Sequence, residues 1–90
     1  MDGRFLQLVA ASAATDPGRV GYIIPRRAIP LAVDRNRLRR RLREAVRAAR
    51  PGLERFDVIL RVRQPIARLD ILAASAEARE LLRRALASAP

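Results

Sequence analysis

Arginine is the residue type with the most specific chemistry in this sequence, and it is concentrated in one stretch. The arginines of that stretch are Arg35, Arg37, Arg39, Arg40, Arg41, Arg43, Arg47 and Arg50. A guanidinium group stays charged, binds phosphate oxygens through paired N–H donors and stacks on bases. A dense group of arginines therefore indicates a polyanion as the partner, with nucleic acid as the first choice.

The overall charge agrees with this interpretation. The 90-residue chain has 19 basic residues against 9 acidic ones, a net charge of +10, and every basic residue is arginine. A net charge this large attracts polyanions from a distance. Because a GC-rich genome also favours arginine and alanine codons, the composition supports a nucleic-acid partner without proving it.

Other chemistry has few residues to carry it. The sequence contains no cysteine and no histidine, so it lacks a thiolate nucleophile, the commonest general base and the commonest zinc ligands. Its carboxylates are not concentrated, and we nominate no catalytic residue, no metal ligand and no cofactor bound by the protein. No stretch approaches the roughly 20 apolar residues of a membrane span and no secretory signal is visible. We therefore expect a soluble, cytoplasmic protein without a membrane partner.

The arginines lie on a segment, residues 34–50, that the pattern predicts to be a helix. Asp34 is a suitable N-cap, and Pro51 with Gly52 is a strong stop signal. The apolar residues of the segment fall within about 100° of arc, the width of a core-facing stripe. They are Leu38, Leu42, Ala45, Val46 and Ala49.

On such a helix most arginines point away from the core. At about 100° per residue, Arg40, Arg43, Arg47 and Asn36 lie nearly opposite the stripe, Arg37 and Arg41 lie on one flank, and Arg35 and Arg39 lie on the other. A merely solvated charged helix is stabilised by alternating signs at i,i+4, but here arginine mostly faces arginine. Asp34 and Glu44 are too few to neutralise this face. We therefore expect a bound polyanion to offset the repulsion.

The rest of the chain predicts a small α+β domain. Residues 4–12 and 19–25 read as strands, and the turn signal at residues 15–18 favours an antiparallel hairpin between them. Residues 56–63 form a third strand, in which Phe56, Val58, Leu60 and Val62 alternate onto one face.

A second amphipathic helix is predicted from residue 70 to residue 87, with Ile71, Ala74, Ala78, Leu81, Leu82 and Ala85 facing inward. The order β-β-α-β-α describes one domain over residues 1–90, a small antiparallel-containing sheet packed with helices as an αβ sandwich. DNA readers of this size usually place a recognition helix among other helices. Because strands surround the arginine helix here, RNA fits better as the partner.

At the arginine helix the sequence resembles the protein component of bacterial ribonuclease P. The family signature runs apolar-x-x-Ala-x-x-Arg-Asn-basic-apolar-basic-Arg-x-apolar-basic. The matching residues are Ile29, Ala32, Arg35, Asn36, Arg37, Leu38, Arg39, Arg40, Leu42 and Arg43. Arg26 and Arg27 resemble the paired basic residues after the family's second strand, Glu44 and Arg47 continue its helix, and Asp57 and Arg63 resemble the ends of its next strand. The resemblance covers roughly residues 5 to 86.

The resemblance implies an accessory role in an endoribonuclease whose catalyst is RNA. In this family the RNA subunit cleaves precursor tRNA with bound Mg²⁺, and the protein binds that RNA and the 5′ leader of the precursor tRNA, assisting 5′ maturation. The implied RNA-binding residues are Arg26, Arg27, Arg35, Asn36, Arg37, Arg39, Arg40, Arg43 and Arg47. For the leader cleft we select Phe5, Tyr22 and Arg63, because aromatic faces stack on bases and arginine meets phosphates. Core packing is the alternative for both aromatic residues. The protein alone is not expected to be catalytic.

One departure from the family concerns the N-terminus. Family members normally begin with a helix of about twenty residues before the first strand, so this chain looks N-terminally shortened. We expect the missing helix to leave apolar sheet surface exposed and thereby to favour self-association. Two other hypotheses stay open: a basic, ribosome-associated RNA-binding protein with no role in tRNA processing, and, less favoured, an autonomous nuclease.

Overall fold

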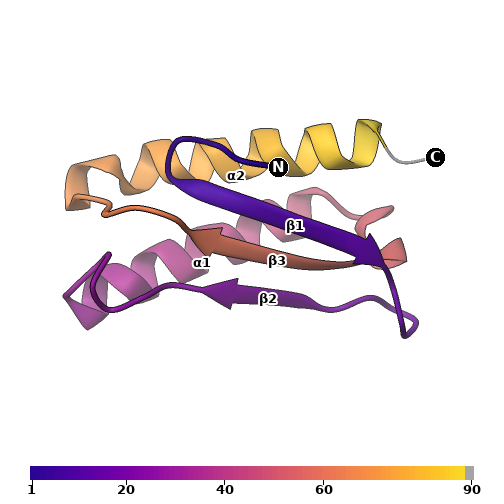
Figure 1. Cartoon of the computed structure of the whole chain (residues 1–90), viewed down its shortest axis with the longest axis horizontal. Helices are drawn as coiled ribbons and strands as arrows, with labels where there is room; N and C mark the ends of the chain where they lie inside the picture. The colour runs from indigo at the N-terminus through magenta and orange to yellow at the C-terminus, as the bar shows by residue number, and fades with distance from the viewer. Residues whose placement is uncertain (89–90) are drawn as a thin grey trace.

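The computed structural model describes residues 1–88 and contains a three-stranded sheet packed on two helices (Figure 1). The elements are β1 (Leu6–Ser12), β2 (Val20–Ile23), α1 (Ala32–Ala48), β3 (Phe56–Val62) and α2 (Ile71–Ala87), with short 3-10 turns η1 (Leu53–Arg55) and η2 (Arg68–Asp70). The predicted α+β class and the order β-β-α-β-α are confirmed. None of the helices in this described part is long and apolar enough to cross a membrane.

The sheet has the order β1-β3-β2, so the predicted hairpin between the first two strands is wrong. β3 lies in the centre, antiparallel to β1 and parallel to β2. Residues 56–62 provide the most regular apolar face, with Val58, Leu60 and Val62 all buried. In the centre of the sheet, β3 pairs with a strand on each side. The stabilisation from these two pairings is larger than the preference of residues 15–18 for a tight turn.

The segment between β1 and β2 is organised by β3 instead of by a tight turn. The Asp57 carboxylate accepts the backbone N–H groups of Ala14 at 3.1 Å and Arg19 at 2.9 Å. These bonds hold the pKa of Asp57 below its ordinary value. Gly18 packs so closely on the start of β3 that a Cβ would collide with the Phe56 carbonyl oxygen. Glycine is therefore required there for space.

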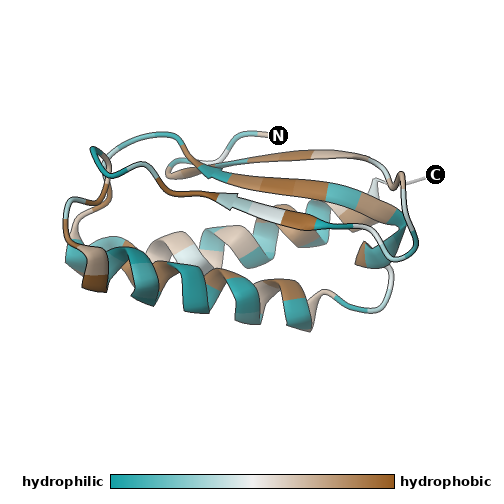
Figure 2. Ribbon diagram, turned by 90° about the horizontal axis from the view of Figure 1, so that it is seen from below, coloured by the Kyte–Doolittle hydropathy of each residue, from teal (hydrophilic) through white to brown (hydrophobic). Residues whose placement is uncertain are grey.

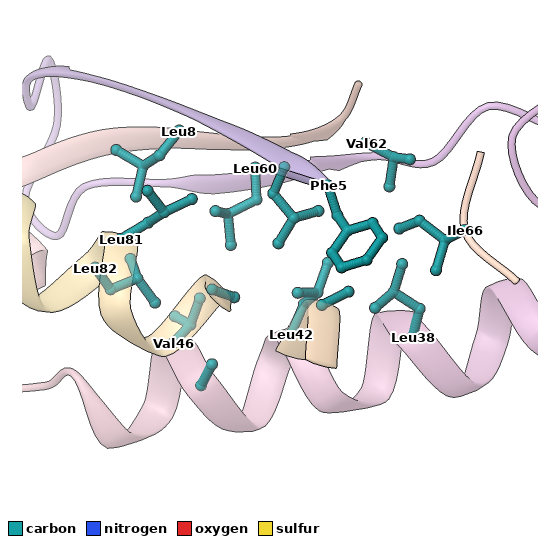
Figure 3. Close-up of a cluster of buried hydrophobic side chains, with 14 of the residues drawn as sticks. Phe5, Leu8, Leu38, Leu42, Val46, Leu60, Val62, Ile66, Leu81 and Leu82 are labelled. Atoms are coloured by element: carbon teal, nitrogen blue, oxygen red, sulfur yellow. The ribbon is translucent and has the colours of Figure 1, made fainter. Parts of the chain in front are cut away.

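The core lies between the sheet and the helices, which cover only one face of the sheet (Figure 2). The predicted stripe of α1 is confirmed for Leu38, Leu42, Ala45 and Val46, whereas Ala49 is half-buried. Leu81 and Leu82 of α2 pack into the same core, next to the side chains from α1 and the sheet (Figure 3). In the second helix, the inward positions are also as predicted, except that Ala85 is only partly buried.

The predicted N-cap of the first helix is wrong. α1 begins at Ala32 after an extended Leu31, and Asp34 lies within the first turn, 6% exposed. There its carboxylate accepts the Arg68 Nε at 3.0 Å. This pair joins the N-terminal ends of the two helices, a long-range contact that outweighs the local capping preference of an aspartate. An acid in the first turn still suits the helix dipole.

The segment before β1 is bound to α2. The Glu77 carboxylate accepts the backbone N–H groups of Arg4 at 2.9 Å, Phe5 at 2.9 Å and Leu6 at 2.7 Å. Gly3 lies against the same carboxylate, and a Cβ on it would collide with Glu77. One side chain thus fixes where the chain enters the sheet.

No helix of residues 1–88 covers the other face of the sheet (Figure 2), and several apolar residues are exposed there. Val9 and Ile59 lie opposite each other in the β1–β3 register and are 50% and 42% exposed, and Ile23 is 46% exposed. Apolar sheet surface is therefore exposed, as expected. Self-association through it stays a prediction.

Candidate nucleic-acid interface

The arginine helix presents its charge to solvent in the predicted orientation. The exposed residues of its polar side are Asn36, Arg37, Arg40, Arg43, Glu44 and Arg47, of which Arg37 was predicted on a flank. Arg35, Arg39 and Arg41 are half-buried, in agreement with their predicted position on the flanks. The core stripe explains this orientation, because burying Leu38 and Leu42 fixes the rotation of the whole helix.

The arginines of this helix divide into two groups by their contacts within residues 1–88. Arg35 donates through Nη1 to the carbonyl oxygens of Ile29 at 2.8 Å and Pro30 at 2.7 Å, so it supports the loop before the helix. Arg39 donates to the Asn36 side chain at 3.1 Å. By contrast, no hydrogen bond or ion pair within this part of the chain involves the guanidinium of any member of the second group. These are Arg37, Arg40, Arg41, Arg43 and Arg47, which we call the free arginines.

The free arginines surround two shallow hollows on the helix surface. One has a volume of about 570 Å³ and is lined by Val33, Asn36, Arg37, Arg40, Arg41 and Glu44. The other, about 420 Å³, is lined by Asn36, Arg39, Arg40, Arg43, Glu44 and Arg47. Guanidinium groups that line an open hollow can bind phosphate oxygens through charge-assisted hydrogen bonds, and Glu44 is the acid that lines both hollows.

Phe5 is buried in this structure, which agrees with the alternative of core packing; a contact between Phe5 and the leader stays a prediction. Its side chain is 5% exposed and packs in the core beside Leu38, Val62 and Ile66 (Figure 3). The Arg4 guanidinium lies over its ring, 4.7 Å from the centroid. The anchoring of the preceding backbone on α2 turns this ring inward, a tertiary effect that the strand pattern did not contain.

Tyr22 lies beside the free arginines. It is half-buried and lines a hollow of about 260 Å³ together with Arg43, Val46, Arg47 and Arg50. Burial raises the pKa of Tyr22, while the charges of Arg43 and Arg50 act in the opposite direction. The phenol therefore stays protonated at neutral pH and offers an O–H donor among guanidinium groups.

Arg63 belongs to a different place, at the carboxyl ends of the parallel strands β2 and β3. Its guanidinium donates to the Gly3 carbonyl oxygen at 2.8 Å. With Arg27 and Arg61 it lines a pocket of about 170 Å³, which we call the strand-end pocket. Arg26 is exposed and does not line it. Phe5, Tyr22 and Arg63 are thus not brought together in one cleft.

Arg61 is a candidate that sequence reasoning missed. It is exposed on the open face of β3, in register with Ile23. The alternation of residues 56–62 was the available signal, because it places Arg61 on the face opposite the core, next to the strand end that carries Arg63. The site was missed because the parallel pairing of β2 with β3 was not foreseen.

The acids of the described chain have structural partners or stand apart. Within residues 1–88 there is no group of three or more histidine, cysteine, aspartate or glutamate side chains placed to hold a metal ion. Glu80 binds Arg83 at 2.6 Å and 3.0 Å, which lowers the pKa of Glu80. Asp57 and Glu77 accept backbone N–H groups.

Fold and surface together describe a small α+β protein whose first helix carries free guanidinium groups on its outer face. The family model described as Ribonuclease P matches residues 1–86 of this chain. The chain belongs to that family of ribonuclease P protein components.

Relatives that bear the name ribonuclease P protein component come from several bacteria. The one from Azotobacter vinelandii is 30% identical over 88 residues, which cover 98% of this chain and 68% of the relative. The one from Nitrosomonas europaea is 37% identical over 65 residues, 72% of this chain and 55% of the relative. The one from Alcanivorax borkumensis is 41% identical over 61 residues, 68% of this chain and 50% of the relative. The chain therefore spans between half and about two thirds of the length of these relatives. No solved structure matches it.

Proposed function

We propose that this chain is the protein subunit of a ribonuclease P and assists the removal of the 5′ leader from precursor tRNA. Family membership supports the role in tRNA 5′ processing. The observation that carries the mode of action is the exposed face of α1, where Arg37, Arg40, Arg43 and Arg47 have no partner within residues 1–88. This face would bind the ribonuclease P RNA.

The free arginines supply binding energy through phosphate neutralisation. Each neutralised phosphate releases condensed counterions, so log K should fall with log salt by about 0.7 to 0.9 per contact. Like-charge repulsion along α1 destabilises the free protein. A bound phosphate backbone removes that repulsion, which makes the helix more stable in the complex than alone.

Catalysis would belong to the RNA, with Mg²⁺ bound by the RNA and not by the protein. The chain lacks histidine and cysteine, so side-chain acid–base or thiolate chemistry has no obvious carrier. The protein would contribute charge neutralisation and positioning to the endoribonuclease.

For the 5′ leader of the precursor tRNA, we propose two contact points, one within β2 and one beyond its end. Tyr22 lies among Arg43, Arg47 and Arg50, where a base can stack and a phosphate can be neutralised. Beyond the end of β2, Arg27 faces the strand-end pocket. β2 ends at Ile23, and Arg27 lies in the turn that follows, so single-stranded RNA could contact the two points in succession along this edge of the sheet.

Reconstitution tests the proposed function. The full chain is added to a bacterial ribonuclease P RNA at low Mg²⁺, and the rate of precursor-tRNA cleavage is measured. We expect clear stimulation by the protein and no cleavage by the protein alone. Unstimulated cleavage, with the RNA shown to be bound, would favour a basic RNA-binding protein of another role. Cleavage without added RNA would instead indicate an autonomous nuclease.

A further inference from the structure

A groove runs between the C-terminal halves of the two helices, on the side of the helical layer away from the sheet. α1 and α2 lie side by side and run in the same direction (Figure 1). Between their ends is a hollow of about 420 Å³ whose lining includes Ala45, Ala48 and Ala49 from the first helix. The side chains of these alanines are single methyl groups, so this part of the groove floor is apolar and does not project far from the helix backbone. A backbone can therefore approach the helices closely here.

Three arginines border this groove. Arg50 follows α1, and Arg79 and Arg83 are one turn apart on α2. Arg79 is exposed and has no hydrogen bond or ion pair within residues 1–88. Arg50 is 3.9 Å from Glu54, a loose surface pair. The acid that binds Arg83, Glu80, does not line the groove. The border therefore has a net positive charge.

The groove continues the arginine surface of the first helix. Arg50 lines both this groove and the hollow that contains Tyr22, Arg43 and Arg47. A ligand that binds the free arginines can thus reach Arg79 without leaving positively charged surface. This continuity favours the same polyanion at both places over a separate acidic protein.

We infer that the RNA-binding surface crosses from α1 to α2, and that the groove receives a sugar–phosphate strand of the same folded RNA. The apolar ribose edges would lie over the alanine floor, and phosphates would meet Arg79 and Arg83 on one side and Arg50 on the other. This inference rests on the proposed function of α1. Contacts from two helices would also fix the orientation of the protein on the RNA, because contacts along α1 alone would let the whole protein turn about the axis of that helix.

A matched pair of substitutions on α2 tests the role of charge. Arg79→Ala removes a groove arginine, and Arg84→Ala removes an exposed arginine of the same helix that does not line the groove. We expect R79A to weaken binding to ribonuclease P RNA by about 3- to 10-fold and to reduce the log–log salt slope by about 0.7 to 0.9. R84A should change affinity less than twofold, because Arg84 does not line the groove and its guanidinium lies 3.8 Å from the Glu80 carboxylate. Equal losses in the two variants would overturn the inference.

Cross-linking tests whether the RNA lies close to the groove floor. Because the chain has no native cysteine, a single introduced thiol can be labelled specifically. Ala48→Cys places a single thiol on the groove floor, and Ala73→Cys places one on an exposed part of α2 that does not line the groove. With a short photoreactive group attached, A48C should cross-link to the RNA and A73C should not. No RNA cross-link from A48C would overturn the inference.

The outcomes separate this inference from the proposed function. If variants in the free arginines abolish RNA binding while R79A matches R84A and A48C gives no cross-link, the groove assignment is wrong and the function of α1 stands. If variants in the free arginines leave RNA binding unchanged, the proposed function itself fails. If an acidic peptide, and not RNA, cross-links to A48C, the groove serves a protein partner and the inference is wrong.

Discussion

The two helices differ in how their charges are satisfied, although they share length, direction and core. Each has 17 residues, and each buries one apolar stripe under the same sheet. In α2 both acids have partners: Glu77 holds the segment before β1, and Glu80 binds Arg83. In α1 five guanidinium groups have none within residues 1–88. Within residues 1–88 only Arg79 among the arginines of α2 lacks such a partner. The larger unsatisfied charge of α1 therefore marks it as the main binding helix, whereas the acids of α2 serve the fold.

The largest expected effect is the loss of RNA binding when the α1 surface is neutralised. The triple variant Arg37→Ala, Arg40→Ala, Arg43→Ala should weaken binding to ribonuclease P RNA by about 100-fold and flatten its salt dependence, because three phosphate contacts are lost. Thermal unfolding should be unchanged or slightly improved, since repulsion is reduced. Filter binding across a salt series measures the first effect, and circular dichroism the second.

A control variant of equal charge makes this result specific. Arg19→Ala, Arg55→Ala, Arg84→Ala removes three exposed arginines outside α1 and should weaken binding far less. A collapsed fold in the α1 variant would mean that its arginines are structural and that the contrast between the helices is false.

In α2 the largest effect should be on stability instead of binding. Glu77→Ala leaves three backbone N–H groups without their carboxylate acceptor, which should lower the free energy of unfolding by about 2 kcal/mol. Urea denaturation measures this loss, and Glu77→Gln should recover part of it by keeping one oxygen acceptor. RNA affinity well below the melting temperature should stay near the wild-type value. A strong loss of affinity in the folded variant would place Glu77 in the binding surface.

Within α1, Arg35 differs from the free arginines because its guanidinium is bound to the protein. Because Arg35 donates to two backbone carbonyl oxygens, Arg35→Ala should lower the free energy of unfolding by about 1 kcal/mol. Arg43→Ala, its control on the free face, should leave stability unchanged. Melting curves of the two variants compare them directly. If both variants have the same melting temperature, the distinction between tied and free arginines has no energetic basis.

The smallest expected effect concerns pH. The backbone N–H groups of Arg19 and Ala14 hold the pKa of Asp57 below its ordinary value of 3.8. A carboxyl whose pKa is lowered by folding stabilises the protein above its unfolded pKa, and that stabilisation is lost as pH falls through the folded value. Asp57→Asn should therefore be less stable than wild type at pH 7, and its stability should decline less steeply with acid below about pH 4. Parallel declines in urea titrations of the two proteins would contradict this account.

Local patterns were sufficient for the features of single elements. The apolar stripe at Leu38, Leu42 and Val46 predicted both the helix and the outward direction of its arginines, because helix geometry relates spacing directly to angle. The alternation in residues 56–62 likewise predicted which face of the third strand is buried. Both features repeat within a few residues, so they can be read without knowledge of the fold.

The candidate site was only partly predictable, because local patterns describe single elements and not the contacts between them. The orientation of Arg37, Arg40, Arg43 and Arg47 followed from the helix alone. By contrast, the inward turn of Phe5 depends on a glutamate more than seventy residues away, and Arg61 reaches the strand-end pocket only because β2 pairs parallel to β3. Contacts between distant segments place Phe5 and Arg61, and the amino-acid composition does not predict these contacts.

The positive charge, the fold class, the two amphipathic helices and the arginine-bearing side of α1 follow from residue type and short-range periodicity. The strand order, the Asp34–Arg68 pair and the groove between the helices arise from contacts between segments that are distant along the chain. Contacts between distant segments depend on which arrangement buries the most apolar surface and leaves no buried polar group unpaired. This arrangement depends on all segments of the chain together, so it cannot be predicted from any short segment of the sequence.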